Sequence, residues 1–107
     1  MNAFDLHIAY VCWGDDGKRR PILVISQEDN IVQAYAITSQ YCNKSENVRS
    51  HLYSINDWAV AGLAKPSYID VGTTIDIPIV FVETSSIGRL SDNDKVQLGT
   101  FIERRSQ

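Results

Sequence analysis

The sequence predicts a small, mainly β protein with one helix near its C-terminal end. Short apolar runs follow one another through the first two-thirds of the 107 residues, and residues that favour turns separate them. A helix-capping pattern precedes the last apolar stretch. Many short strands followed by one terminal helix are typical of a small, mostly antiparallel barrel on which the helix packs.

Six segments have the length and composition of strands. An Asp-Gly pair within residues 14–17 favours a hairpin turn after the first strand, and Pro21 suits the first position of the second strand. Pro78 suggests a bend or an edge position between the last two strands. The predicted strands are residues 6–13, 21–25, 31–38, 48–54, 67–71 and 79–83.

Helical signals occur in two places. Asn56 can cap a short helical turn that Gly62 ends. Nearer the C-terminus, Ser91 stands three residues before Asp94, a spacing in which the serine caps a helix. The apolar residues that follow share one face of this predicted helix; they are Leu98, Phe101 and Ile102.

The composition excludes several classes of protein. With 44% hydrophobic and 21% charged residues, the chain can bury a core and is not disordered. It has neither a long apolar run nor the pattern of a signal peptide, so we expect a cytoplasmic protein without membrane contact. The formal net charge of −3 argues against indiscriminate binding of nucleic acid, which would need a local positive site.

The cysteines and histidines favour neither metal nor thiol chemistry. Cys12 and Cys42 are too few for a disulfide framework, and together with His7 and His51 they lack the spacing of metal ligands. No base accompanies either cysteine in the sequence, which disfavours a nucleophilic thiol. We therefore predict no metal site and no cofactor.

Four segments, taken in order, resemble the PemK/MazF/Kid toxins of bacterial toxin–antitoxin pairs. Residues 18–26 (KRRPILVIS) resemble the family's R-R-P-x-L-V-x-S segment, and residues 36–40 (AITSQ) resemble its strand-end I-T-S-Q. Residues 62–67 (GLAKPS) resemble G-L-x-K-P-S of the PemK-like branch, and residues 87–91 (IGRLS) resemble the lead-in to the C-terminal helix. The resemblance extends over most of the chain, from Leu6 to Ile102.

The resemblance implies one toxin domain over residues 1–107, folded as an SH3-like barrel of the CcdB/PemK type with a C-terminal helix packed on it. It also implies a homodimer that cleaves single-stranded RNA without a metal ion, as the endoribonuclease (mRNA interferase) of a type II toxin–antitoxin system. A cognate antitoxin would cover the RNA groove. By motif match, the family's catalytic arginine and threonine fall on Arg20 and Thr38.

Arginine and threonine suit RNA cleavage in which the ribose 2′-hydroxyl is the nucleophile. A planar guanidinium such as that of Arg20 can bind two phosphate oxygens and stabilise the extra negative charge of the transition state. The Thr38 hydroxyl can donate a hydrogen bond to the same phosphate. Neither histidine lies in a matched motif, so the general acid and base stay open, with donation from Arg20 to the leaving oxygen as one alternative.

The residues around these motifs are candidates for binding RNA. The predicted RNA contacts are Lys18, Arg19, Ser39, Gln40, Lys65 and Ser67, and the candidates for base stacking are Trp13, Tyr41 and Tyr53. Structural roles are the alternatives: a Lys-Arg-Arg run is usually a solvated turn, and Thr38 can close a strand by bonding nearby backbone. Trp13 and Trp58 are more often core or interface residues, and we expect Arg89 to be structural.

A non-catalytic binding module on the same fold is the alternative function. This class contains CcdB-like gyrase poisons and inactive paralogues that bind only an antitoxin or nucleic acid. The acidic charge favours it, and so does the short segment at residues 14–18, where the family often has a long RNA-gripping loop. The Arg20–Thr38 pair, and a chain end without the aromatic residue that gyrase poisons use, favour the enzyme.

Overall fold

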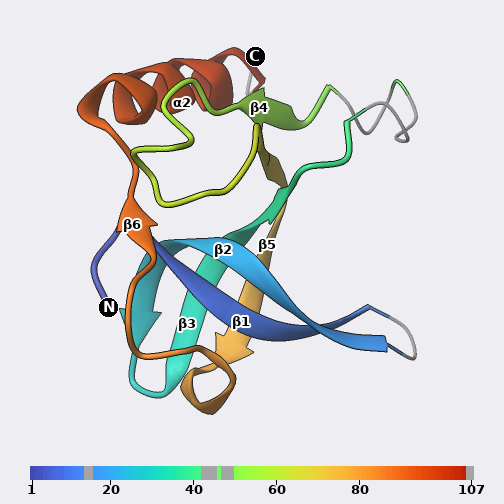
Figure 1. Ribbon diagram of the computed structural model, residues 1–107, viewed down its shortest axis with the longest axis vertical. Coiled ribbons are helices and arrows are strands. Elements are labelled where there is room, and N and C mark those ends of the chain that lie inside the picture. Colours follow the sequence, from blue (N-terminus) through green and yellow to red (C-terminus); the bar gives the residue numbers. More distant parts are fainter. Residues whose placement is uncertain (14–15, 42–45, 47–49, 106–107) are drawn as a thin grey trace.

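The computed structural model describes residues 1–13, 16–41, 46 and 50–105, and for residues 11–13 and 16–18 it describes the backbone only. The elements of these residues include strands, a 3₁₀ helix and an α-helix (Figure 1). In order, these elements are β1 (Asp5–Trp13), β2 (Asp16–Glu28), β3 (Ile31–Thr38), β4 (Leu52–Ser54), β5 (Tyr68–Pro78), η1 (Ile79–Phe81), β6 (Gly88–Arg89) and α2 (Asp92–Arg105).

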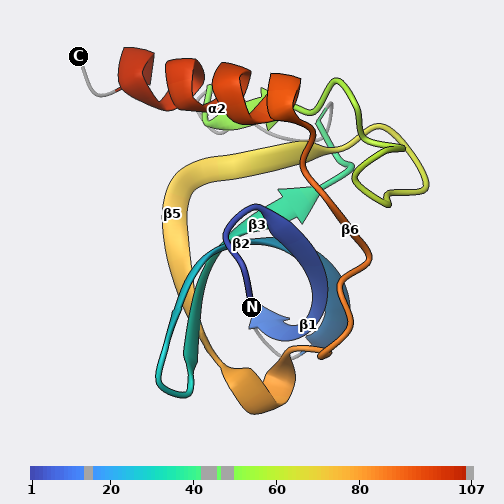
Figure 2. The ribbon, with the colours of Figure 1, turned by 90° about the vertical axis from the view of Figure 1, so that its left-hand side faces the viewer.

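The strands form one antiparallel sheet in the order β4-β5-β3-β2-β1-β6. The sheet curls round on itself, and α2 lies across one end of it (Figure 2). β1 and β2 form a long ribbon whose tip projects beyond the other strands (Figure 1). The predicted class, mainly β with a C-terminal helix packed on the sheet, is confirmed.

Side chains of the central strands alternate between two apolar clusters. In β2, Leu23 belongs to one cluster, whereas Ile22 and Val24 belong to the other, as expected when successive residues point to opposite faces. The first cluster lies between the sheet and α2 and contains Leu6, Leu23, Ile37, Tyr53, Ile55, Ala61, Ile69, Val71, Leu90 and Leu98. The second lies on the other face and contains Ala9, Ile22, Val24, Val32, Ala34, Ile77 and Val82.

A buried carboxylate joins α2 to the rest of the molecule. The side chain of Asp94 is fully buried and accepts the Tyr53 hydroxyl at 2.7 Å and the backbone N–H groups of Asn56 and Asp57 at 3.0 and 2.8 Å. The Asp94 N–H donates to Ser91 Oγ at 3.1 Å, which confirms the predicted cap. Burial alone would raise the pKa of Asp94, but the hydrogen bonds outweigh it and lower the pKa below its usual value.

The first three predicted strands are confirmed, and β2 is longer than expected. Pro21 lies inside β2 rather than at its start. It is tolerated there because the pairing of β2 with β3 ends at Ile22, so the missing N–H removes no bond from that side. Asp16 and Gly17 belong to β2, and residues 14–15, which connect the two strands, lie outside the described residues.

Two further segments agree with the expectation in part. Of the strand expected over residues 48–54, β4 contains the last three residues, while residues 48 and 49 lie outside the described part. The segment after Asn56, where one short helical turn ended by Gly62 was expected, forms successive turns. One of these turns is closed by the bond from the Ala61 N–H to the Asp57 carbonyl.

The strand predicted over residues 79–83 is wrong. Residues 68–78 form one long strand, β5, and Ile79–Phe81 form a 3₁₀ turn. The pairing of β5 with β3 ends at Pro78 opposite Ile31, where β3 begins, so no partner strand extends further. The chain therefore turns, with the Ile79 N–H bound to the Asn30 carbonyl, and rejoins the sheet where Val82 bridges to Ala9.

In the part of the chain that the structure describes, no helix has the length and apolar character needed to span a bilayer.

Candidate active site

The candidate site lies where β2 and β3 separate. Their last paired residues are Ile22 and Ala36, and Arg20 and Thr38 lie two positions beyond that pair on their strands. Because side chains alternate between the faces of a strand, both residues lie on the face that this last pair occupies. The two residues that the motifs predict as catalytic thus share one face of the sheet at its open end.

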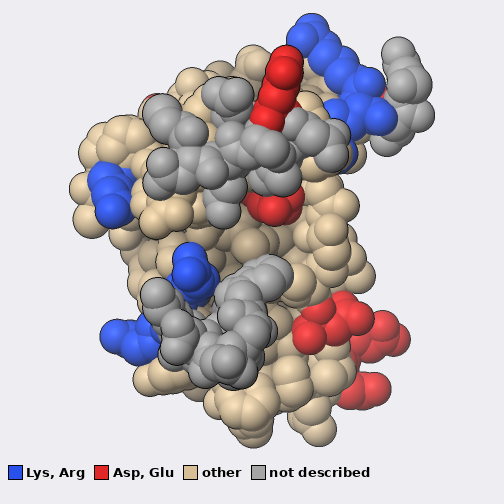
Figure 3. Space-filling view, turned by 90° about the vertical axis from the view of Figure 1, so that its right-hand side faces the viewer, with Lys and Arg blue, Asp and Glu red and all other residues tan. Residues whose placement is uncertain are grey.

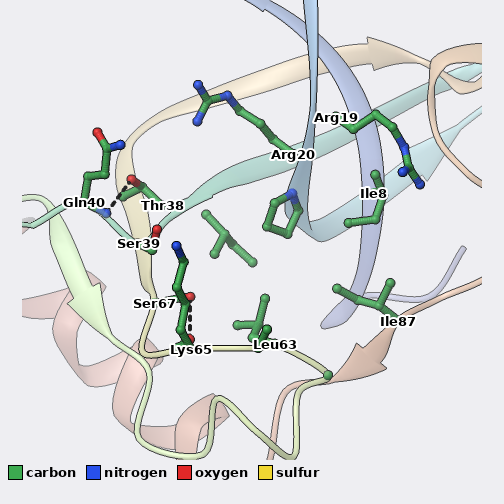
Figure 4. Close-up of a pocket in the computed structure, with 14 residues that line it drawn as sticks. Ile8, Arg19, Arg20, Thr38, Ser39, Gln40, Leu63, Lys65, Ser67 and Ile87 are labelled. Atoms are coloured by element: carbon green, nitrogen blue, oxygen red, sulfur yellow. Dashed lines mark hydrogen bonds between the residues drawn. The ribbon is translucent and has the colours of Figure 1, made fainter.

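A pocket of about 560 Å³ opens at this end of the sheet. The apolar side chains that line it are Ile8, Pro21, Ile37, Leu63, Ala64 and Ile87, and its polar ones are Arg19, Arg20, Thr38, Ser39, Gln40, Lys65 and Ser67. These polar residues are the predicted site residues from separate segments of the chain (Figure 4). Lys18, the remaining predicted contact, has its side chain outside the described part.

Arg20 has a buried nitrogen without a hydrogen-bond partner. The residue is half-buried, and among the described residues no acceptor binds its enclosed Nε. The guanidinium extends toward the side of the pocket where Thr38 and Gln40 lie (Figure 4). Buried donors are almost always paired in proteins. An oxyanion in the pocket would supply an acceptor, and a guanidinium can bind it through two parallel hydrogen bonds.

Thr38 combines a local structural role with an available donor. Its Oγ1 accepts the backbone N–H of Gln40 at 3.1 Å, which shapes the turn at the end of β3. A hydroxyl that accepts a hydrogen bond keeps its own hydrogen to donate elsewhere. Ser39 and Gln40 follow at exposed positions on the rim of the pocket.

Two glycines hold the loop of residues 62–67 in one wall of the pocket. Gly62 has a φ of +90°, and a Cβ there would lie 2.0 Å from the carbonyl oxygen of Ile87. A Cβ on Gly88 would lie 2.2 Å from the carbonyl oxygen of Ala61. Glycine permits both the positive φ and the contact between the two backbones. This contact brings Leu63 and Ile87 to the same pocket, although they are far apart in sequence.

Lys65 and Ser67 belong to this loop and have different surroundings. Ser67 is buried, and its hydroxyl donates to the Lys65 carbonyl at 2.9 Å, so it supports the shape of the loop. Lys65 is exposed, and its ammonium end points toward Ser39 (Figure 4). Within the described ranges Lys65 forms no ion pair.

Arg19 lines the pocket but is bound to a carboxylate outside the lining. Its Nε donates to Glu83 Oε2 at 2.8 Å, and its Nη2 contacts the same oxygen. The hydrogen bond to Glu83 and the negative charge of Glu83 raise the pKa of Arg19 above its ordinary value. Both side chains are partly exposed to solvent.

None of the aromatic residues proposed for base stacking is among the described residues that line the pocket. Tyr53 is only 7% exposed and donates to Asp94, so it belongs to the core. Tyr41 stacks on Tyr68 with 4.8 Å between ring centroids. The side chain of Trp13 lies outside the described residues, and Trp58 packs against the first cluster.

The histidines and Arg89 have partners away from the pocket. His7 is buried, and its Nδ1 bonds the Glu83 carbonyl at 2.8 Å; a carbonyl only accepts, so this nitrogen carries the hydrogen. His51 contacts Arg105. Arg89 pairs with Asp5 of β1 at 3.7 Å.

Neither a metal cluster nor a conventional base lines the pocket, as far as the described residues extend. No three His, Cys, Asp or Glu side chains among them come together to hold a metal ion. The described lining contains no histidine and no carboxylate. Its charged groups are the cations Arg19, Arg20 and Lys65, so the pocket suits an anionic ligand.

Charges are unevenly distributed over the face shown in Figure 3. Acidic side chains gather at its lower right, away from the lysine and arginine side chains at its left, and further acidic side chains lie near its top and centre. Glu28, Asp29 and Asp76 line a separate hollow that contains none of the residues of the site. The net acidic charge of the chain is therefore compatible with a local positive site.

Sequence reasoning missed the apolar lining and the partner of Arg19. Ile8 and Ile87 were not expected in the site, and Glu83 was placed in a strand. Arg19 and Glu83 are 64 residues apart. The sequence around Glu83 contains no signal that identifies its partner.

The fold places this pocket in a known structural context. The structure is similar to the Mycobacterium tuberculosis toxin MazF-mt6, with a TM-score of 0.70 and 25% sequence identity over 94% of this chain and 93% of that chain. The fold is MazF-like. A scan against protein-family models and a search of curated proteins both find no match to the sequence. The MazF-like fold agrees with the resemblance that the four sequence motifs indicate.

Proposed function

We propose that this chain is the toxin of a type II toxin–antitoxin system and acts as a metal-independent, sequence-selective endoribonuclease on single-stranded RNA. One observation carries the proposal: Arg20 and Thr38 lie on one face of a MazF-like fold, in a pocket whose described charged residues are all cations. The domain spans residues 1–107, functions in the cytoplasm as a homodimer, and is inhibited by a cognate antitoxin that covers the pocket.

The chemistry that we propose needs no nucleophile from the protein. The ribose 2′-hydroxyl attacks the adjacent phosphorus, the bond to the 5′-oxygen of the next nucleotide breaks, and a 2′,3′-cyclic phosphate and a 5′-hydroxyl result. The hydroxyl loses its proton and the leaving oxygen gains one, so the proton count balances. The protein stabilises the charge that develops in the transition state, and such stabilisation often accounts for most of an enzyme's rate enhancement.

The pocket residues divide this work in the proposal. Arg20 binds the non-bridging oxygens of the reacting phosphate through its guanidinium, and Thr38 donates its free hydroxyl hydrogen to the same group. Lys65 and Arg19 bind neighbouring phosphates. Ser39 and Gln40 lie on the rim, where they can contact bases, and Ser67 contributes by holding the loop. The apolar side chains that line the pocket, among them Ile8 and Ile87, give an unstacked base a surface to pack against.

The experiment that tests this proposal uses a long, mixed-sequence single-stranded RNA in excess EDTA. Primer extension locates the cuts, and a second RNA then carries a single 2′-deoxynucleotide at the strongest cut. We expect discrete cuts, 2′,3′-cyclic phosphate ends, and loss of that one cut in the deoxy-substituted RNA. Cuts that survive the deoxy substitution would contradict the mechanism. Binding of RNA without any cut would favour the non-catalytic binding module.

A further inference from the structure

Glu83 is held in a fixed position beside β1. Its N–H donates to the Ile8 carbonyl at 2.8 Å, and its own carbonyl accepts Nδ1–H of His7 at 2.8 Å. The preceding residue, Val82, is buried and bridges to Ala9. The backbone that carries this carboxylate is thus anchored on both sides, and the side chain extends from a defined point.

The carboxylate of Glu83 forms an ion pair with the guanidinium of Arg19. One oxygen, Oε2, accepts from Nε and also contacts Nη2. The side chains are 56% and 40% exposed for Arg19 and Glu83. Exposed ion pairs are weak and exchange readily with other partners, because water screens the attraction and both side chains are flexible. An anion of higher charge density can therefore compete with Glu83.

The ion pair directs Arg19 away from the centre of the pocket. Arg19 and Arg20 are consecutive in β2, and in Figure 4 their side chains extend in different directions. Glu83 does not line the site; it lies in a neighbouring hollow with Tyr10 and Phe81. The structure thus shows a cation at the edge of the site, bound by a carboxylate that lies just outside it.

We propose that Glu83 is an intramolecular competitor for Arg19, which a phosphate of the bound strand displaces. In the free protein Arg19 binds Glu83, and on binding it exchanges that carboxylate for a phosphate next to the one held by Arg20. Glu83 thereby lowers the affinity of the site for RNA and makes this affinity less dependent on the salt concentration. This inference rests on the proposed function, because it concerns the regulation of the same site.

A double-mutant cycle on binding tests this inference. The probe is a fluorescent 2′-O-methyl oligonucleotide of the cut sequence, or of mixed sequence if no cut is found, so that binding is read without cleavage. The proteins are wild type, Glu83→Gln, Arg19→Ala and the double variant, with Asp76→Asn as the matched control. Asp76 is an exposed carboxylate in the separate acidic hollow, so this control removes the same charge away from Arg19.

We expect Glu83→Gln to tighten binding by about three- to tenfold at moderate salt, since one opposing charge is removed. The slope of log affinity against log salt should steepen by about 0.7, as for one additional phosphate contact with a single strand. In the Arg19→Ala background the same substitution should change the affinity less than about twofold, like Asp76→Asn in the wild type.

Three results would each overturn the competition between Glu83 and RNA for Arg19. Glu83→Gln could raise the RNA affinity equally with and without Arg19, Asp76→Asn could raise it as much as Glu83→Gln does, or Glu83→Gln could bind RNA more weakly than the wild type. These results leave RNA cleavage by the wild type intact. If the double-mutant cycle gives the expected result but no RNA is cut, the proposed catalysis fails, while the proposed competition of Glu83 with RNA for Arg19 stands. Absence of binding by every variant, in protein shown to be folded, overturns both.

Discussion

Arg20 and Thr38 lie where two neighbouring strands, β2 and β3, separate and leave room for polar side chains on one face. Each lies two residues beyond the last β2–β3 pair, where these two strands no longer pair with each other. Arg20 keeps an enclosed Nε without a partner in the described residues, and Thr38 uses one lone pair locally while its hydrogen is available. Both features are more easily explained by an anionic ligand than by stability alone.

Removing the Thr38 hydroxyl should affect the reaction more than binding. We expect Thr38→Val to lower the cleavage rate by about a hundredfold, in the range for loss of one preorganised donor. Thr38→Ser keeps the hydroxyl and should stay within about tenfold of wild type. Single-turnover cleavage of a short RNA with one cut site measures both. Equal rates for Thr38→Val and Thr38→Ser would show that the hydroxyl takes no part.

The sequence could predict the residues of the site that lie in contiguous motifs. Arg20, Thr38 and Lys65 each stand in a short segment with its own pattern, and the structure brings all three to one pocket. Glu83 could not be found, since its contact with Arg19 depends on the path of the chain after β5. The burial of Tyr53 was also hidden, because its polar partner Asp94 lies 41 residues away.

At the scale of elements, the loop before β5 is held between two anchors. Asp94 of α2 binds the backbone at Asn56 and Asp57, and the contact of Gly62 with Ile87 fixes the far part of the loop. Lys65 lies between this contact and the start of β5. The position of the pocket wall therefore depends on α2 and on the segment before β6.

A pair of glycine substitutions tests the second anchor. Gly62→Ala places a Cβ against the Ile87 carbonyl at a positive φ, and we expect it to lower the free energy of unfolding by about 2–4 kcal/mol. Gly99→Ala, in α2 with no atom within 4 Å of the new Cβ, should stabilise the protein by about 0.5–1 kcal/mol. Urea unfolding measures both. Two changes of the same sign would contradict the close contact.

The first anchor predicts a dependence of stability on pH. The folded-state pKa of Asp94 lies below the reference value of 3.8, so its contribution is present above about pH 4 and is lost as the pH falls through the folded-state pKa. We expect Asp94→Asn to cost about 2 kcal/mol at pH 7, with the difference from wild type shrinking toward low pH. Denaturant unfolding at several pH values checks this. A difference that stays constant down to about pH 2 would count against it.

At the scale of elements, the predictions that are confirmed concern features that neighbouring residues in the sequence determine. The cap at Ser91 and Asp94 defined the start of α2 correctly, and short apolar runs between turn residues identified the first three strands. The strand expected over residues 79–83 failed because strand formation also needs a partner, and the pairing with β3 has ended by then. Apolar composition could not reveal this, since Val80 and Phe81 are exposed in the 3₁₀ turn.

At the scale of the whole molecule, a net negative charge is compatible with a cationic pocket, because the described lining of the pocket contains no carboxylate. A net charge of −3 keeps non-specific attraction to nucleic acid weak, while the pocket offers a local positive site. Apolar side chains also remain on the surface, among them Val80 at 82% and Val96 at 66% exposure. Such residues are available for a two-fold interface, in which identical patches meet.

The proposed homodimer predicts a defined mass in solution. Light scattering after gel filtration at micromolar concentration should give about twice the chain mass of 12.0 kDa. The mass should not change with salt if the interface is mainly apolar. A mass of one chain under these conditions would contradict the dimer and leave the pocket as a monomeric site.

The most direct test is the single-turnover cleavage rate of Arg20→Ala in EDTA. Arg104→Ala, at an exposed position near the end of α2, is the matched control, and circular dichroism verifies that all three proteins are folded. We expect Arg20→Ala to lose about a hundred- to a thousandfold in rate, as for removal of a preorganised charge, while the control cuts like the wild type. A rate for Arg20→Ala within about tenfold of wild type would contradict an active site built on Arg20.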